Sequence, residues 1–101
     1  MTIYRVILKI DAKHDIAKVY DYIEQELFAP YAAENFLRGI YACIANLETN
    51  AAMFAISTYD YVLRYGANAR TVKYKGFTII YTIHGYNVLV HRIVHGSLIY
   101  K

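Results

Sequence analysis

A chain of 101 residues is long enough for one hydrophobic core but too short for two, so we expect a single domain over residues 1–101. Its hydrophobic fraction of 57%, with five glycines and one proline, excludes a disordered chain, and no apolar run reaches the roughly 18 to 20 residues of a membrane helix. The single cysteine, Cys43, excludes an internal disulfide framework and a multi-cysteine zinc site. The N-terminal segment does not resemble a secretory signal, and we therefore expect a cytoplasmic protein with no membrane partner.

The net charge of +3 is divided unevenly between the two halves of the chain. Residues 1–48 contain five basic and seven acidic residues, a balance of −2, whereas residues 49–101 contain six basic residues and only Asp60 as an acid, a balance of +5. This excess indicates that the C-terminal half contacts an anionic partner, either nucleic acid or an acidic protein. Acidic residues that gather in helices would also leave the remainder basic by default.

The first half of the chain predicts a strand followed by two helices. Apolar residues alternate over residues 3–10, which is typical of a strand with one apolar face. Asp11 offers an N-cap, and a spacing of three to four residues then predicts an amphipathic helix from Ala12 to about Phe28. Pro30 suits the first turn of a second helix, which would form a hairpin with the first. Its predicted buried stripe, with Cys43 beside it, is Ala33, Phe36, Leu37, Ile40, Ile44 and Leu47.

The second half predicts a long loop and three strands. Residues 48–68 show no period, so we expect a loop containing one short turn of structure. Strand patterns follow at residues 69–75, 77–83 and 87–95, separated by turns at Gly76 and at residues 84–86. The order β-α-α-β-β-β predicts an α+β fold, with the helix hairpin packed on one face of a small, mainly antiparallel sheet that the first strand joins.

The last predicted strand carries the most informative polar residues, in "VHRIVHGSLIY" at residues 90–100. Strict alternation would place His91 and His95 on one face and Arg92 on the other, among Val88, Val90 and Val94. A guanidinium there needs an acidic partner or an open concave surface, or it extends its charged end to solvent. His95 precedes Gly96 and could exchange protons near neutral pH, or simply cap the strand. We expect His91 to be structural, hydrogen-bonded in the core or facing the helices.

Basic residues on the neighbouring strands extend this cluster. Arg70, Lys73 and Lys75 have few acids near them in sequence, which is typical of a phosphate-binding surface. Tyr74 and Tyr100 lie among them and could stack on unpaired bases, although tyrosine is favoured in strands whatever their function. We take Lys73, Lys75 and Tyr74 as candidate substrate-binding residues. His91 and His95 would lie roughly 13 Å apart on a regular strand, so no metal site is expected.

The chain contains no glycine-rich phosphate loop, nucleophile elbow, Cys and His pair or HExxH motif. An enzyme of this sequence would therefore work through acid, base and charge stabilisation, without a metal or cofactor.

The order and spacing of these features resemble the RelE/ParE superfamily, the toxins of type II toxin–antitoxin pairs. The resemblance covers nearly the whole chain and includes "GANAR" at residues 66–70, "IIY" at residues 79–81, and the spacing from Arg92 to His95 and Gly96. It implies a metal-independent endoribonuclease that cleaves mRNA on the ribosome and is silenced by a cognate antitoxin. Arg70 and Arg92 would hold the scissile phosphate, and His95 or Tyr100 would move protons as the ribose 2′-hydroxyl attacks.

The sequence also departs from the ribonuclease members of the superfamily. Its third strand has Thr78 where those members often carry an arginine, and residues 48–68 contain no lysine. Both features are compatible with the ParE branch, whose members share the fold, lack the catalytic set and inhibit DNA gyrase. We expect an mRNA interferase, with a ParE-type gyrase inhibitor as the alternative and a homologue that has lost toxicity as a third possibility.

Overall fold

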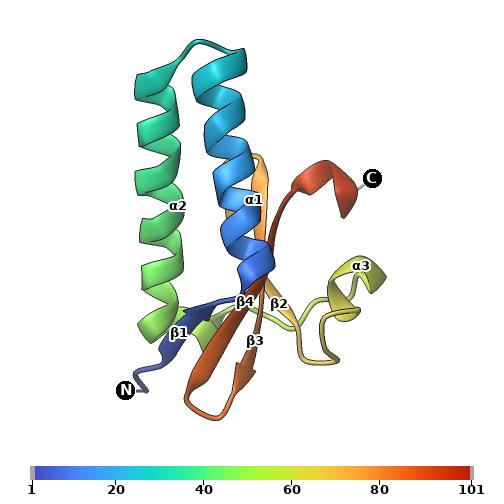
Figure 1. Cartoon of the computed structure of the whole chain (residues 1–101). Helices are drawn as coiled ribbons and strands as arrows, with labels where there is room; N and C mark the ends of the chain where they lie inside the picture. The colour runs from blue at the N-terminus through green and yellow to red at the C-terminus, as the bar shows by residue number, and fades with distance from the viewer. Residues whose placement is uncertain (1, 101) are drawn as a thin grey trace.

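The computed structural model describes residues 2–100 as two long helices packed on a four-stranded sheet (Figure 1). Strand β1 (Arg5–Leu8) leads into helix α1 (Ile10–Asp21), which continues as a π-helical turn (Tyr22–Glu26), and helix α2 (Pro30–Asn50) runs back. The remaining elements are the 3-10 turn Ala51–Met53, α3 (Asp60–Leu63), β2 (Arg70–Tyr74), β3 (Phe77–His84), β4 (Asn87–His95) and the 3-10 turn Gly96–Leu98. The predicted α+β fold and its element order are confirmed.

Helix boundaries differ from the sequence prediction at two points. Helix α1 begins at Ile10, so Lys9 occupies the N-cap position and Asp11 lies inside the first turn. There the negative charge of Asp11 interacts favourably with the positive end of the helix dipole. Helix α2 begins at Pro30 as predicted but extends to Asn50, past the expected start of the loop. In residues 2–100 no helix is long and apolar enough to cross a membrane.

The strand order in the sheet is β1-β4-β3-β2. Strands β2, β3 and β4 form the predicted antiparallel meander, whereas β1 runs parallel to β4, with Arg5 opposite Asn87 and Leu8 opposite Val90. The helical connection between β1 and the meander allows this parallel pairing, which a tight hairpin cannot make. Just past the end of β1, the Lys9 amide donates to the Val90 carbonyl over 2.9 Å. From His91 onward, this edge of β4 has no neighbouring strand within residues 2–100.

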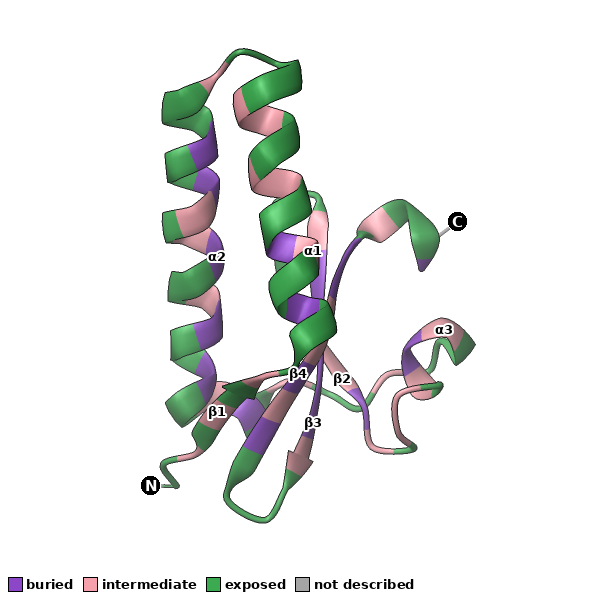
Figure 2. Ribbon diagram, viewed as in Figure 1, coloured by how far each residue is buried: buried purple, intermediate pink, exposed green. Residues whose placement is uncertain are grey.

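The helix hairpin covers one face of the sheet and forms the main core with it (Figure 2). The predicted stripe of α2 is confirmed, since Ala33, Phe36, Ile40, Ile44 and Leu47 are buried, with Leu37 and Cys43 half-buried beside them. From the sheet they meet Ile79, Tyr81, Val88, Val90 and Ile93. Removing an aliphatic side chain of this size from water contributes about 1.5 to 3 kcal/mol, so this contact holds the hairpin on the sheet.

The opposite face of the sheet, called the outer face below, is covered in part by a second, smaller core. Val62 of α3, Ala69 just before β2 and Ile99 just after the C-terminal turn pack on Ile80 and Val94. The predicted loop contains more structure than the one short turn expected, because the 3-10 turn Ala51–Met53 and helix α3 both lie in it, and α3 packs on the sheet.

A β-bulge in β4 decides which side chains share a face. Ile80 lies opposite Arg92 and Tyr81 lies opposite Val90, so His91 is an extra residue in β4. Val88, Val90 and Ile93 consequently face the helices, whereas Arg92 and Val94 share the outer face with Ile80. The prediction that Arg92 shares a face with Val88 and Val90 is wrong, because strict alternation fails across the bulge.

Candidate functional site: the polar residues of the sheet

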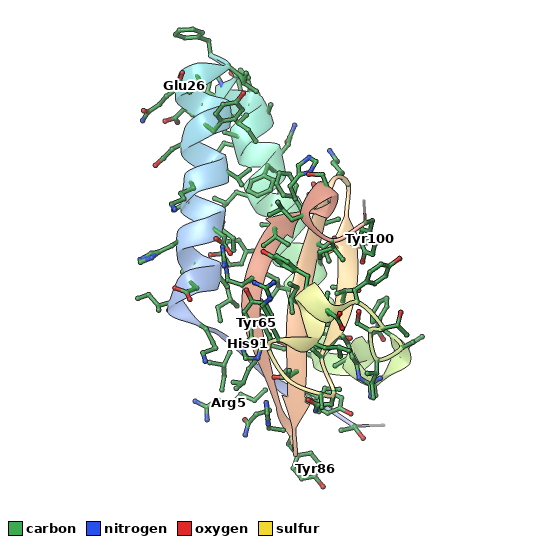
Figure 3. The ribbon with its side chains drawn as sticks, turned by 90° about the vertical axis from the view of Figure 1, so that its right-hand side faces the viewer. Arg5, Glu26, Tyr65, Tyr86, His91 and Tyr100 are labelled. Atoms are coloured by element: carbon green, nitrogen blue, oxygen red, sulfur yellow. The ribbon has the colours of Figure 1, made fainter. Side chains whose placement is uncertain are left out.

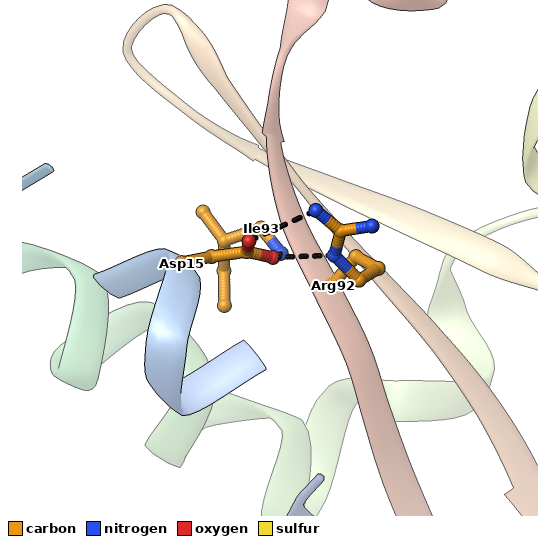
Figure 4. A network of polar contacts seen from close by, with 3 residues as sticks. All are labelled: Asp15, Arg92 and Ile93. Atoms are coloured by element: carbon orange, nitrogen blue, oxygen red, sulfur yellow. Dashed lines mark hydrogen bonds and ion pairs between the residues drawn. The ribbon is translucent and has the colours of Figure 1, made fainter. Parts of the chain in front are cut away.

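Arg92 is held by Asp15 of helix α1 (Figure 4). Its Nε donates to Oδ2 of Asp15 over 2.7 Å and its second terminal nitrogen donates to Oδ1 over 2.9 Å, which is a two-point, charge-assisted contact. The Ile93 amide also donates to Oδ2 over 2.9 Å. Asp15 thus accepts a backbone hydrogen bond from the edge of β4 beyond β1, and the same carboxylate holds the Arg92 guanidinium in place.

The surroundings of Arg92 reinforce its charge. The hydrogen bond to Asp15, with a smaller contribution from Tyr65, raises the pKa of Arg92 further above its ordinary range. The exposed fractions are 32% for the Arg92 side chain and 11% for the Asp15 side chain. This is the only ion pair among residues 2–100. Of the alternatives that the sequence left open for Arg92, an acidic partner, an open concave surface or a charged end extended to solvent, the structure shows the acidic partner, 77 residues away in sequence.

Arg70 lies on the other face of the sheet. It is opposite Tyr81 in the β2–β3 ladder and therefore points towards the helices. Its Nη1 donates to the carbonyls of Ala52, over 3.2 Å, and Phe54, while its Nε is buried without a hydrogen-bond partner. Arg70 ties the segment after α2 to the sheet, and it does not meet Arg92.

Tyr81 fixes the same segment from within the core. Its hydroxyl donates to the Ala51 carbonyl over 2.6 Å. Burial raises the pKa of Tyr81 to about 12, although the nearby Arg70 opposes the shift. The neutral phenol is therefore the donor that keeps this buried carbonyl satisfied.

His95 is exposed, but one ring nitrogen is occupied. Its Nδ1 accepts from the Ser97 amide over 3.2 Å and lies 2.9 Å from the Ser97 hydroxyl, so it caps the C-terminal turn. The ring also packs edge-on against Phe77, with centroids 5.8 Å apart. Because Nδ1 accepts, the neutral ring carries its proton on Nε2, the nitrogen left free to meet a ligand.

The candidate lysines and tyrosines separate into two pairs. Lys73 Nζ lies 4.2 Å from the ring centroid of Tyr100, whose ring packs edge-on against Tyr59. Lys75 Nζ lies 5.6 Å from the ring centroid of Tyr74, and this ring packs against Gly39 of α2. The first pair belongs to the outer face and the second to the helix side, so the candidates do not form one continuous surface.

The bulge creates a histidine cluster that the sequence did not reveal. Thr82 Oγ1 lies 2.7 Å from Nε2 of both His91 and His84, and the ring of Tyr65 packs 5.6 Å from that of His91 (Figure 3). Burial, together with Lys9 and His84, lowers the pKa of His91. His91 is hydrogen-bonded as predicted but lies on the outer face with Thr82 instead of facing the helices. Among residues 2–100, no three His, Cys, Asp or Glu side chains converge as metal ligands would.

Comparisons with known proteins agree with this architecture. Residues 6–100 match a family described as the ParE toxin of the type II toxin–antitoxin system, parDE. The fold is similar to a structure of the chromosomal ParDE toxin–antitoxin system from P. aeruginosa, with a TM-score of 0.76 and 18% identity over 92% of this chain and 96% of that one. A search of curated proteins finds no match. The chain therefore belongs to the ParE family, the toxins of type II toxin–antitoxin systems.

Proposed function

We propose that this toxin acts by binding DNA gyrase and inhibiting it, with no chemical step of its own. One observation carries the proposal: the two arginines that a ribonuclease would need are held by partners within the fold, on opposite faces of the sheet. Arg92 is bound by Asp15, Arg70 by two backbone carbonyls, and Nδ1 of His95 by Ser97. Gyrase inhibition is what the resemblance to the ParE branch implies. The proposal places the protein in the cytoplasm, where its target lies.

The physical reason is that phosphoryl chemistry needs free cations aimed at one place. Transition-state charge is stabilised when donors converge on it without reorganising. Here Arg70 and Arg92 point to opposite faces of the sheet, so the two guanidinium groups do not converge on one phosphate. Breaking a partly buried, hydrogen-bonded ion pair costs free energy that a phosphate contact would first have to replace.

The family also implies a cognate antitoxin. A partner rich in acidic residues would complement the excess of +5 in residues 49–101. Basic side chains on and beside the outer face, such as Lys73 and Arg64, would meet such a partner without disturbing the core.

Two assays on the purified full chain test the proposal. In the first, gyrase holoenzyme supercoils a relaxed plasmid in the presence of increasing toxin, and we expect supercoiling to be lost. In the second, a cell extract translates a defined mRNA with added toxin, and primer extension should show the transcript intact. Uninhibited gyrase together with a cleaved transcript would refute the proposal, and failure of expressed toxin to arrest growth would indicate a non-toxic homologue.

The ribonuclease hypothesis has one observation in its favour. Nζ of Lys73 lies over the ring of Tyr100, and the exposed His95 makes no hydrogen bond through Nε2 among residues 2–100. If this surface cleaves RNA, then His95→Ala, in a chain that still folds, should lower cleavage by about 100-fold or more, the typical contribution of a general acid or base. If His95→Ala leaves growth arrest unchanged, the histidine has no catalytic role.

A further inference from the structure

The end of the helix hairpin exposes a group of large apolar side chains that the fold does not use. Phe28 and Tyr31 are each 86% exposed, and Tyr22 and Leu27 are 55% and 54% exposed. We call these four residues, Tyr22, Leu27, Phe28 and Tyr31, the hairpin tip. The tip lies far from the sheet, where Glu26 marks it at the top of Figure 3. A cluster of exposed aromatic residues on a small protein is typical of an interaction site.

The backbone holds the tip in a defined and strained conformation. Phe28 has a φ of 51°, in the left-handed region that a bulky residue rarely adopts, and α1 ends in the π-helical turn Tyr22–Glu26. Beneath the tip, Tyr20 of α1 donates to Glu34 of α2 over 2.7 Å, which ties the two helices together. Strain of this kind points to a functional requirement, because a glycine at position 28 would relieve it.

The charge around the tip indicates which partner fits it. Residues 19–37 contain Asp21, Glu24, Glu26 and Glu34 and no lysine or arginine, a balance of −4. The rest of the chain has eleven basic residues against the remaining four acids, a balance of +7. Anionic lipid and nucleic acid would be repelled by the tip, and a partner that complements the basic remainder would be repelled as well. A protein surface with lysine or arginine around an apolar pocket complements it.

We propose that the hairpin tip docks into an apolar pocket, rimmed by lysine or arginine, on the protein that this toxin inhibits. Phe28 and Tyr31 enter the pocket, and the acidic residues beside them pair with its rim. The antitoxin then binds elsewhere on the chain. This inference rests on the proposed function in one respect, that the toxin acts by binding a protein target.

The first experiment compares the full chain with the double variant Phe28→Ser/Tyr31→Ser in cells that lack the antitoxin. Tyr86→Ser is the matched control, because Tyr86 is 75% exposed and lies in the β3–β4 turn at the opposite end of the molecule (Figure 3). We expect the tip variant to lose growth arrest while still co-purifying with the antitoxin, and the control to retain both. Growth arrest by a folded tip variant would overturn the proposal, as would a loss of antitoxin binding.

The second experiment measures binding of the same proteins to gyrase holoenzyme. We expect the dissociation constant to rise at least tenfold for the tip variant, and Asp21→Lys/Glu26→Lys to weaken binding at low salt but much less at about 1 M salt, where charges are screened within about 3 Å. Wild-type protein that fails to bind gyrase, while tip variants still lose growth arrest, refutes the gyrase target and leaves the tip proposal standing. Association of the wild type with anionic vesicles, or a dimer that the tip variant abolishes, would identify a different occupant and refute it.

Discussion

The contact between Asp15 and Arg92 gives the sharpest test of how the fold uses its polar residues. Asp15→Asn removes the carboxylate that accepts from Nε of Arg92, from its terminal nitrogen and from the Ile93 amide. Exposed ion pairs contribute about 0 to 1 kcal/mol, whereas breaking a buried pair costs about 3 to 5 kcal/mol. With the arginine 32% and the aspartate 11% exposed, we expect a loss of about 2 kcal/mol of unfolding free energy. For a domain of this size that is a fall in Tm of about 8 to 16 °C.

Urea unfolding followed by circular dichroism measures this loss. A double-mutant cycle of Asp15→Ala and Arg92→Met then isolates the pair, and we expect a coupling energy of about 1 to 2 kcal/mol. Asp21→Asn is the control on the same helix, since Asp21 is exposed and makes no side-chain hydrogen bond or ion pair among residues 2–100, and it should change stability by less than about 0.5 kcal/mol. A coupling energy below about 0.5 kcal/mol would refute the structural role of Arg92, and Arg92 would again be a candidate for ligand binding.

Three further predictions concern a glycine, a histidine and the strained phenylalanine. Gly39→Ala should destabilise the protein by about 1 to 3 kcal/mol despite its better helix propensity, because the new Cβ would lie 1.9 Å from the Tyr74 hydroxyl; Tyr74→Ala should restore part of the loss in urea unfolding. Burial, Lys9 and His84 lower the pKa of His91 in the folded protein, so on acidification the unfolded chain takes up the proton first and the unfolding free energy falls below about pH 6.5. His91→Gln should flatten this dependence of the unfolding free energy on pH, and an unchanged dependence would contradict the reasoning. Phe28→Gly should raise the unfolding free energy by about 1 kcal/mol by relieving the positive φ, and a lower urea midpoint would contradict the strain.

Much of the architecture could be read from local patterns. The stripe of α2 and the strand Asn87–His95 were predicted closely, because helix and strand periods are written directly into the order of apolar residues. Pro30 and Gly76 marked boundaries because their backbone preferences are local as well. The uneven division of charge between the two halves of the chain is likewise a property of the sequence alone.

The candidate site was harder to predict because it depends on register and on distant partners. One extra residue at His91 reverses the alternation of β4 and moves Arg92 away from the valines with which it was grouped. No local pattern in the sequence signals a bulge at that position. The separation of Arg70 from Arg92 likewise follows from the pairing of three strands, and not from either residue's neighbours.

The sequence by itself determined the helix hairpin, the meander and the excess of positive charge in the second half, since each follows from residues near one another in the chain. Only the tertiary structure decided that Arg92 binds Asp15 and that Arg70 binds the carbonyls after α2. It also decided that the apolar residues at the end of the hairpin remain exposed. The physical reason is that the partner of a polar side chain is set by which segments pack together in the fold, and these segments are distant in the sequence.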